Sequence, residues 1–212
     1  MPRPVTTLRD LQAYRDLPQS QLAVIAAASI LFAQNGVAAT TTHEVAYLAG
    51  VAESLVYRRF KTKSGLLNVV CAPFFDEIVP QMTHTIAAIT AAAESVQAFV
   101  AGFAKQWLTF TTSYRDLLTI VTTVPAYAER WQQAQNDLLQ RALTVPITHY
   151  QRIGALITGE PARIGRDLIG IWAGEWIIDR PFEPSPVALD RFVAAHLNNV
   201  LTMLTPPAQN AV

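Results

Sequence analysis

Residues 41–67, TTHEVAYLAGVAESLVYRRFKTKSGLL, decide the fold. Thr41 and Glu44 have the spacing of a capping box, in which each side chain satisfies a backbone N–H at the start of a helix. Gly50 ends this helix, since glycine accepts the left-handed backbone of a tight turn. A second short helix is predicted over about 52–60, and its core candidates are Leu55, Val56 and Phe60. Two short helices that meet at a glycine turn indicate a helix-turn-helix unit.

Helices are also predicted on both sides of this unit. The upstream helix runs from about Ser20, a plausible N-cap, to Asn35, and Gly36 is its stop. The downstream helix begins near Thr62. The apolar stripe of the upstream helix contains Leu22, Ile25, Ala26, Ser29, Phe32 and Ala33. That of the downstream helix contains Leu66, Leu67, Val69 and Val70.

The rest of the chain also reads as helical. Helix breakers recur every 10–25 residues or so, at Pro80, Pro125, Pro146, 159–161 and 181–186, and no alternating strand pair is convincing. The predicted fold class is therefore all-α: an N-terminal three-helix bundle with a helix-turn-helix, plus a larger helical C-terminal domain. The predicted boundaries are an extension (1–19), a helix-turn-helix domain (20–67) and a C-terminal domain (68–212). For the extension, a short amphipathic helix and a frayed tail both remain open.

Composition narrows the class of protein. With 51% hydrophobic and 15% charged residues, the 212-residue chain can bury a large core. The net charge is zero, but residues 1–67 hold seven basic and four acidic residues, including a basic cluster at Arg58, Arg59, Lys61 and Lys63. The single cysteine, Cys71, permits no intramolecular disulfide and is expected to be a packed thiol. No membrane span or signal peptide is recognised, so a cytoplasmic location is expected.

At this point the residues resemble a known family. Residues 26–70, AAASILFAQNGVAATTTHEVAYLAGVAESLVYRRFKTKSGLLNVV, resemble the DNA-binding domain of tetracycline-repressor (TetR) regulators. The resemblance covers about a quarter of the chain. The matching positions are Phe32, Gly36, Thr40, Thr41, Val45, Ala46, Ala49, Gly50, Val51, Leu55, Tyr57, Phe60, Lys63, Leu66 and Leu67.

The resemblance implies a set of DNA-contacting residues. The helix from about Ala52 would lie in the major groove, so its first turn, Ala52, Glu53 and Ser54, would read bases. For Glu53, complementarity to the positive helix N-terminus is an equally good explanation. Phosphate contacts would come from Thr40, Thr42, Tyr57, Arg58, Arg59 and Lys63.

Two positions depart from the family pattern. Ala52 stands where the family often has Ser or Thr, so the second helix loses a side-chain N-cap. Arg59 stands where the family usually has His, which adds a permanent charge. Both departures bear on which operator sequence is read.

The resemblance also implies that 20–67 is a DNA-binding domain and that 68–212 is a ligand-binding and dimerisation domain. Aromatic residues at helical spacing are often simply core, but a small, largely apolar effector would be bound by Phe103, Trp107, Trp131, His149 and Tyr150. The last two helices, about 161–178 and 186–204, would pair with those of a second subunit in a twofold dimer. The predicted interface residues are Ile164, Leu168, Ile171, Trp172, Leu189, Phe192, Val193, His196, Leu197 and Val200.

The predicted function is that of a homodimeric repressor that leaves double-stranded operator DNA when it binds its effector. No catalytic motif is recognised and the four histidines are scattered, so neither an enzyme, a cofactor nor a metal site is predicted. The alternative is a helical small-molecule-binding or protein-interaction module without specific DNA binding.

Overall fold

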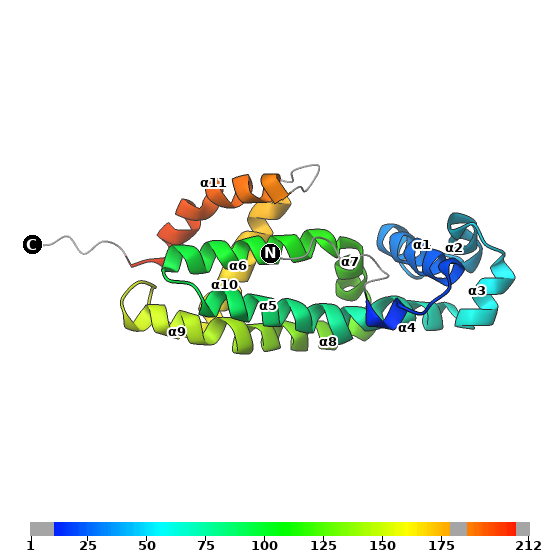
Figure 1. Ribbon diagram of the computed structural model, residues 1–212, viewed down its shortest axis with the longest axis horizontal. Helices are drawn as coiled ribbons and strands as arrows, with labels where there is room; N and C mark the ends of the chain where they lie inside the picture. Colours follow the sequence, from blue (N-terminus) through cyan, green and yellow to red (C-terminus); the bar gives the residue numbers. More distant parts are fainter. Residues whose placement is uncertain (1–10, 179–185, 207–212) are drawn as a thin grey trace, which may run out of the picture. The chain divides into compact units, whose positions relative to one another are not determined.

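A computed structural model describes residues 11–178 and 186–206, and every regular element within these ranges is helical (Figure 1). The all-α prediction is confirmed. Packing groups the described residues of 1–80 and 113–133 into a first compact unit, and those of 81–112 and 134–212 into a second. The boundary near residue 67 between DNA-binding and effector domains is a division by function and stays a prediction.

The first unit contains the predicted helix-turn-helix. A single 3₁₀ turn, η2 (Gln12–Tyr14), precedes α1 (Gln19–Asn35), α2 (Thr42–Ala49), α3 (Glu53–Phe60) and α4 (Lys63–Pro73). The helix α7 (Arg115–Thr123) packs on α1 and α4 within the same unit.

Helix α1 differs from the prediction at its start and in its burial. It begins at Gln19, with Pro18 as an N-cap that makes no side-chain bond, so Ser20 is not the cap. Val24 and Ala28, outside the predicted stripe, are fully buried. The reason is that α2, α4 and α7 all pack on α1, so one stripe cannot describe its buried surface.

The predicted local signals of α2 are present. Thr41 Oγ1 accepts from the Glu44 backbone N–H at 3.2 Å, and the Glu44 carboxylate accepts from the Thr41 N–H at 2.7 Å. The bonds that the Glu44 carboxylate accepts from the Thr41 backbone N–H and hydroxyl lower the pKa of that carboxyl group below its usual value. Gly50 follows in the left-handed conformation (φ 67°), as a glycine stop requires.

The corner between α3 and α4 is tight. Lys61 holds a left-handed φ of 63°, the only positive φ at a non-glycine position in the described residues. Thr62 then caps α4, its side chain accepting from the Gly65 N–H at 2.9 Å. A Cβ at Gly65 would collide with the Phe60 carbonyl oxygen, so this position requires glycine.

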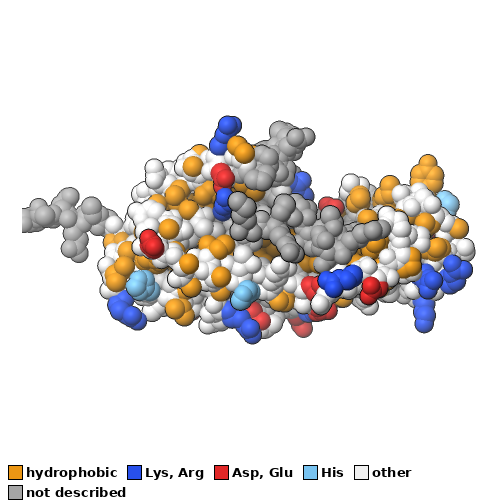
Figure 2. Space-filling view, in the orientation of Figure 1, with side chains coloured by type: hydrophobic (Ala, Val, Ile, Leu, Met, Phe, Trp, Pro, Cys, Tyr) orange, Lys and Arg blue, Asp and Glu red, His pale blue; other side chains and the backbone are white. Residues whose placement is uncertain are grey.

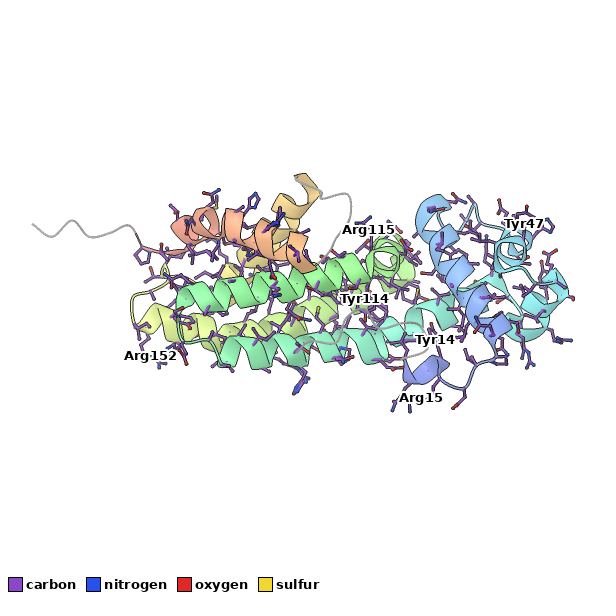
Figure 3. All side chains as sticks on the ribbon, turned by 45° about the horizontal axis from the view of Figure 1, so that its top comes forward. Tyr14, Arg15, Tyr47, Tyr114, Arg115 and Arg152 are labelled. Carbon is purple, nitrogen blue, oxygen red and sulfur yellow. The ribbon has the colours of Figure 1, made fainter. Side chains whose placement is uncertain are left out.

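The described part of the N-terminal extension is anchored. The Glu77 carboxylate accepts from the Gln12 and Ala13 N–H groups at 2.7 and 2.9 Å. Tyr14 is buried, and its hydroxyl donates to the Val69 carbonyl of α4 at 2.6 Å (Figure 3). The segment is therefore a docked helical turn, while residues 1–10 of the predicted extension lie outside the described residues.

Cys71 lies in the core of the first unit, on α4, with no exposed surface. Burial raises the pKa of its thiol to about 11. The thiol is therefore protonated at neutral pH, as expected for a packed cysteine.

The second unit holds α9 (Thr144–Arg152), α10 (Pro161–Ile178) and α11 (Pro186–Leu204) together with most of α5 (Val79–Ala91) and α6 (Val96–Ser113). Helix α8 (Pro125–Leu138) begins in the first unit and ends in the second. None of the helices in the described ranges is long and apolar enough to cross a membrane.

Two prolines that were expected to break helices lie inside them instead. Pro80 lies in the second position of α5 and Pro146 in the third position of α9. Each follows a five-residue π-helical segment, η3 (Phe74–Ile78) or η4 (Leu139–Leu143). A proline removes one N–H donor and crowds the preceding turn, and the wider π turn relieves that crowding.

We expect Gly65→Ala to destabilise the first unit by about 1–3 kcal/mol, because its new methyl group must displace the Phe60 backbone. Urea unfolding followed by circular dichroism measures this loss. Ser64→Ala, at the exposed neighbouring position, is the control and should change the midpoint little. Equal midpoints for both variants would contradict the requirement for glycine at this corner.

Candidate nucleic-acid interface

Helix α3 presents two different faces. Val56 and Phe60 are buried and fix the helix to the unit from behind. Ser54 and Arg58 are exposed, and Tyr57 keeps 53% of its surface exposed. Ala52 is the N-cap and makes no side-chain bond, as its sequence predicted.

A hydrogen-bonded network joins α2 to the start of α3. Thr42 Oγ1 donates to Glu53 Oε1 at 2.8 Å and is also hydrogen-bonded to Tyr57 Oη at 2.9 Å. The other carboxylate oxygen of Glu53 lies 3.5 Å from His43 Nδ1. The structure thus brings together Thr42, Glu53 and Tyr57, and this contact with α2 sets the orientation of the Glu53 carboxylate.

Cationic side chains collect beside this network. Arg58, Arg59 and Lys61 are all exposed, and Figure 2 shows Lys and Arg side chains gathered over the α3 end of the first unit. Arg58 and Arg59 occupy the last turn of α3, where positive charge also complements the helix C-terminus. Such a face is suited to the phosphates of a nucleic acid backbone.

Lys63 is engaged within the protein. Its Nζ donates to the carbonyls of Ala38 and Thr40 at 2.9 and 3.0 Å, and so ties the start of α4 to the loop before α2. An ammonium group has three protons, so one donor is left for a phosphate.

Thr40 is buried. Its exposed fraction is 1%, and its hydroxyl donates to the carbonyls of Leu31 and Gly36 at 3.1 and 2.9 Å. Those bonds close the turn between α1 and α2, and they leave this side chain away from the exposed face.

Helix α2 exposes a surface that sequence reasoning missed. Tyr47 is 84% exposed and points away from the domain in Figure 3. Leu48 is also exposed, at 51%. Only Val45 and Ala46 of α2 are buried, since two helical turns offer few inward positions. The sequence signal that could have revealed this surface is Tyr47 itself, which directly follows the buried pair.

The residues predicted for the effector site are spread out. Phe103 and Trp107 of α6 are buried and stacked, with ring centroids 6.1 Å apart. Tyr150 is buried with its hydroxyl donating to the Ala93 carbonyl at 2.9 Å, and His149 beside it is exposed. Trp131 belongs to the first unit, 5.8 Å from the Phe74 ring. The structure thus brings together only parts of this set.

Most residues predicted for the dimer interface are buried within one chain. Trp172 packs against Phe192 at 6.4 Å between ring centroids, which joins α10 to α11. Ile171, His196 and Leu197 are half-buried. The buried members of the predicted interface are Ile164, Leu168, Trp172, Leu189, Phe192, Val193 and Val200. The residues left exposed on α11, which sequence reasoning did not select, include Val187 and Met203.

No three His, Cys, Asp or Glu side chains of the described residues converge where a metal ion could bind. The arrangement on the first unit is instead a short helix held by its buried side, with polar and cationic groups on its outer side. This arrangement is that of a helix-turn-helix unit whose outer face is suited to nucleic acid.

Comparison with known proteins identifies the family of this domain. Residues 24–70 match the model of the family described as bacterial regulatory proteins, tetR family. No curated protein matches the chain.

Solved structures share the fold over most of the chain. A tetR-family transcriptional regulator from Mesorhizobium loti MAFF303099 is 17% identical, with a TM-score of 0.60 over 92% of this chain and 99% of that one. The ketosteroid transcriptional regulator KstR2 of Mycobacterium tuberculosis is 16% identical, with a TM-score of 0.59 over 88% and 95%. SmeT, solved as a triclosan complex, is 19% identical, with a TM-score of 0.57 over 90% and 94%. Residues 24–70 thus match the tetR-family DNA-binding domain, and the chain as a whole shares the fold of these solved structures.

We expect Lys63→Met to lower the free energy of unfolding by about 1–2 kcal/mol, because two carbonyls lose a charged donor. Urea unfolding of the variant tests this, with Arg59→Met as a control that removes an exposed charge from α3. If Lys63→Met unfolds like the unchanged protein and only weakens DNA binding, the lysine acts on phosphate alone.

Proposed function

We propose that this protein is a homodimeric repressor that binds double-stranded operator DNA through α3 and is released by a small, largely apolar effector. The observation that carries the proposal is the outer face of α3, where Ser54, Tyr57 and Arg58 are exposed beside the oriented carboxylate of Glu53. A helix of this kind places its first turn against base edges and its charged residues against phosphates.

The roles within α3 follow from these positions. Glu53 is positioned by Thr42, so its carboxylate can accept from a cytosine amino group in one defined direction. Ser54 can donate or accept. Arg58 and Arg59 neutralise phosphates without regard to sequence, and Tyr57 and Tyr47 can donate to phosphate oxygens.

The second unit supplies the effector and dimer functions in this proposal. The similar fold of a ketosteroid regulator and of a regulator solved with triclosan supports an apolar effector. Since the inward sides of α10 and α11 are buried within the chain, the dimer would use their outer sides. An effector that prefers one dimer conformation would shift the spacing of the two α3 helices and so release DNA.

The alternative is a helical ligand-binding or protein-interaction module without specific DNA binding. The cationic face of α3 and the Thr42–Glu53–Tyr57 network argue against it, because a module that does not bind DNA has no need of either.

DNA binding can be tested with the intergenic DNA beside the gene, in a mobility-shift assay over a salt series. We expect a specific shift that weakens steeply with salt, and Arg58→Ala to reduce the salt slope by about one. Glu53→Gln should change the free-energy difference between the preferred base and the other bases at one position by about 1–3 kcal/mol. Val145→Ala, at an exposed position of α9, is the control.

Two results would contradict this assignment. A dimer that shifts only weakly and is displaced by any competitor DNA would favour the alternative function. If Arg58→Ala and Glu53→Gln altered sequence preference in the same way, the division between phosphate and base contacts would be wrong.

The dimer surface gives a separate prediction. Leu197→Glu places a charge at a half-buried position of α11, and we expect it to convert the dimer to a monomer with unchanged helix content. Sedimentation velocity measures the mass, and Val145→Glu, exposed on α9, should stay dimeric. A Leu197→Glu dimer as tight as the unchanged one would move the interface elsewhere.

A further inference from the structure

Helix α4 lacks one of its own hydrogen bonds at Pro73. In an α-helix the Val69 carbonyl would accept from the backbone N–H four residues later, and Pro73 has no N–H. The π-helical segment η3 begins directly afterwards, at Phe74. A carbonyl that is shielded from water and left without a donor costs free energy, so the Val69 carbonyl needs a donor from elsewhere in the protein.

Tyr14 supplies that donor from the N-terminal segment. Its hydroxyl donates to the Val69 carbonyl at 2.6 Å and lies 3.3 Å from the Val70 carbonyl. The side chain is only 2% exposed. Burial raises the pKa of this hydroxyl group above its usual value, so the group stays protonated and keeps its donor at neutral pH. The Tyr14 hydroxyl thus takes the place of the N–H that Pro73 lacks.

The same N-terminal turn is also bonded to the chain after the proline. The Glu77 carboxylate of η3 accepts from the Gln12 and Ala13 N–H groups at 2.7 and 2.9 Å. Residues 11–14, called here the N-terminal brace, are therefore bonded to α4 before Pro73 and to η3 after it. A π-helical segment is a local departure from regular α-helical hydrogen bonding, and the brace holds the chain on both sides of its start.

Helix α8 also contacts both α4 and η3. The Tyr127 ring stacks on Phe75 of η3 at 5.8 Å between ring centroids, and its hydroxyl donates to Asn68 Oδ1 of α4 at 2.9 Å. These contacts join side chains, whereas Tyr14 bonds to the backbone at the proline itself. Tyr127 therefore provides a matched comparison for Tyr14, since each tyrosine hydroxyl bonds to α4.

Helix α4 connects the brace to the helix that would meet DNA. In its first turn, Gly65 lies so close to the Phe60 carbonyl of α3 that a Cβ there would collide with it. Val69 is four residues further along α4, which is about 6 Å. A helix transmits displacement as a stiff element over such a length. A change in the direction of α4 at Val69 would therefore displace the last turn of α3.

We propose that Tyr14 is a positioning residue for DNA binding. By donating to the carbonyl that Pro73 leaves without a partner, it holds α4, and through α4 the helix α3, in the orientation that operator DNA requires. This inference rests on the proposed function, because it concerns the orientation of the same α3. Without the hydroxyl, a fraction of the molecules has α3 in other orientations, and the apparent affinity for DNA falls in proportion.

The test is a double-mutant cycle on the full chain, with the intergenic DNA beside the gene as the probe. Tyr14→Phe removes only the hydroxyl, and Pro73→Ala restores a backbone N–H that can bond to the Val69 carbonyl. We expect Tyr14→Phe to weaken DNA binding about three- to tenfold when residue 73 is proline, and less than about 1.5-fold when it is alanine. The salt slope should stay unchanged, because no phosphate contact is removed.

Hydrogen exchange measures the same effect without DNA. In the free protein, Tyr14→Phe should raise the exchange rate of α4 amides about tenfold, and Pro73→Ala should reverse most of that increase. Tyr127→Phe is the matched control, and its effect on DNA binding should be the same with either residue at position 73. Gln12→Ala, which changes an exposed side chain and keeps the backbone N–H, should bind DNA like the unchanged chain.

Circular dichroism at the assay temperature establishes that each variant is folded. If Tyr14→Phe does not fold, Glu77→Gln tests the other connection of the brace. This variant removes the charge from the acceptor of the Gln12 and Ala13 N–H groups, and it should weaken DNA binding about two- to fivefold. Its matched control is Glu129→Gln, at an exposed position of α8 in the same unit.

Failure of this proposal differs from failure of the proposed function. If the unchanged chain shifts the DNA specifically and folded Tyr14→Phe binds it equally well, the positioning role is overturned and the regulator stands. An equal loss of affinity with proline and with alanine at position 73 also overturns it, because the lost bond would not be the one at the proline. If the unchanged chain gives no specific shift, the proposed function is overturned and this inference with it.

Discussion

Two left-handed backbone positions bracket the helix that would meet DNA, and its orientation depends on both. Gly50 (φ 67°) turns the chain from α2 into α3, and Lys61 (φ 63°) turns it from α3 into α4. The first turn is free of strain because glycine has no Cβ, while the second costs about 1–2 kcal/mol for a residue with a side chain. Lys61 is held there because Thr62 caps α4 immediately afterwards. The direction of α3 is therefore set by backbone geometry at both ends, and Val56 and Phe60 fix it from behind.

Local signals explain which parts of the fold could be predicted. The capping box at Thr41, the stop at Gly50 and the cap at Thr62 each depend on residues no more than four positions apart. Such local signals can be read directly from the sequence. Helix α1 is covered by α2, α4 and α7, and α7 is about ninety residues away, so no stripe on α1 encodes the burial of Val24. The π segments before Pro80 and Pro146 were likewise missed, because proline was treated as a breaker without regard to a wider turn beside it.

In the candidate sites, too, the sequence predicted the local features and missed the long-range contacts. Sequence placed Glu53, Tyr57 and the arginines on one short helix, and the structure has them exposed or oriented there. It could not anticipate that Lys63 and Thr40 also bond to carbonyls of the α1–α2 connection, at Ala38, Thr40 and Gly36, since that loop has no pattern of its own. For the long helices of the second unit, aromatic spacing placed Phe103 and Trp107 on one helix, where both are buried and stacked. Helical spacing alone does not reveal which neighbouring helix each side chain faces.

The position of Cys71 has a chemical consequence for the whole protein. It is the only sulfhydryl of the chain, it lies in the core of the unit that carries α3, and its thiolate is a minute fraction at neutral pH. Peroxides and electrophiles react with thiolates that they can reach. In the folded state this thiol is therefore not a point at which peroxides or electrophiles act on the unit that carries α3.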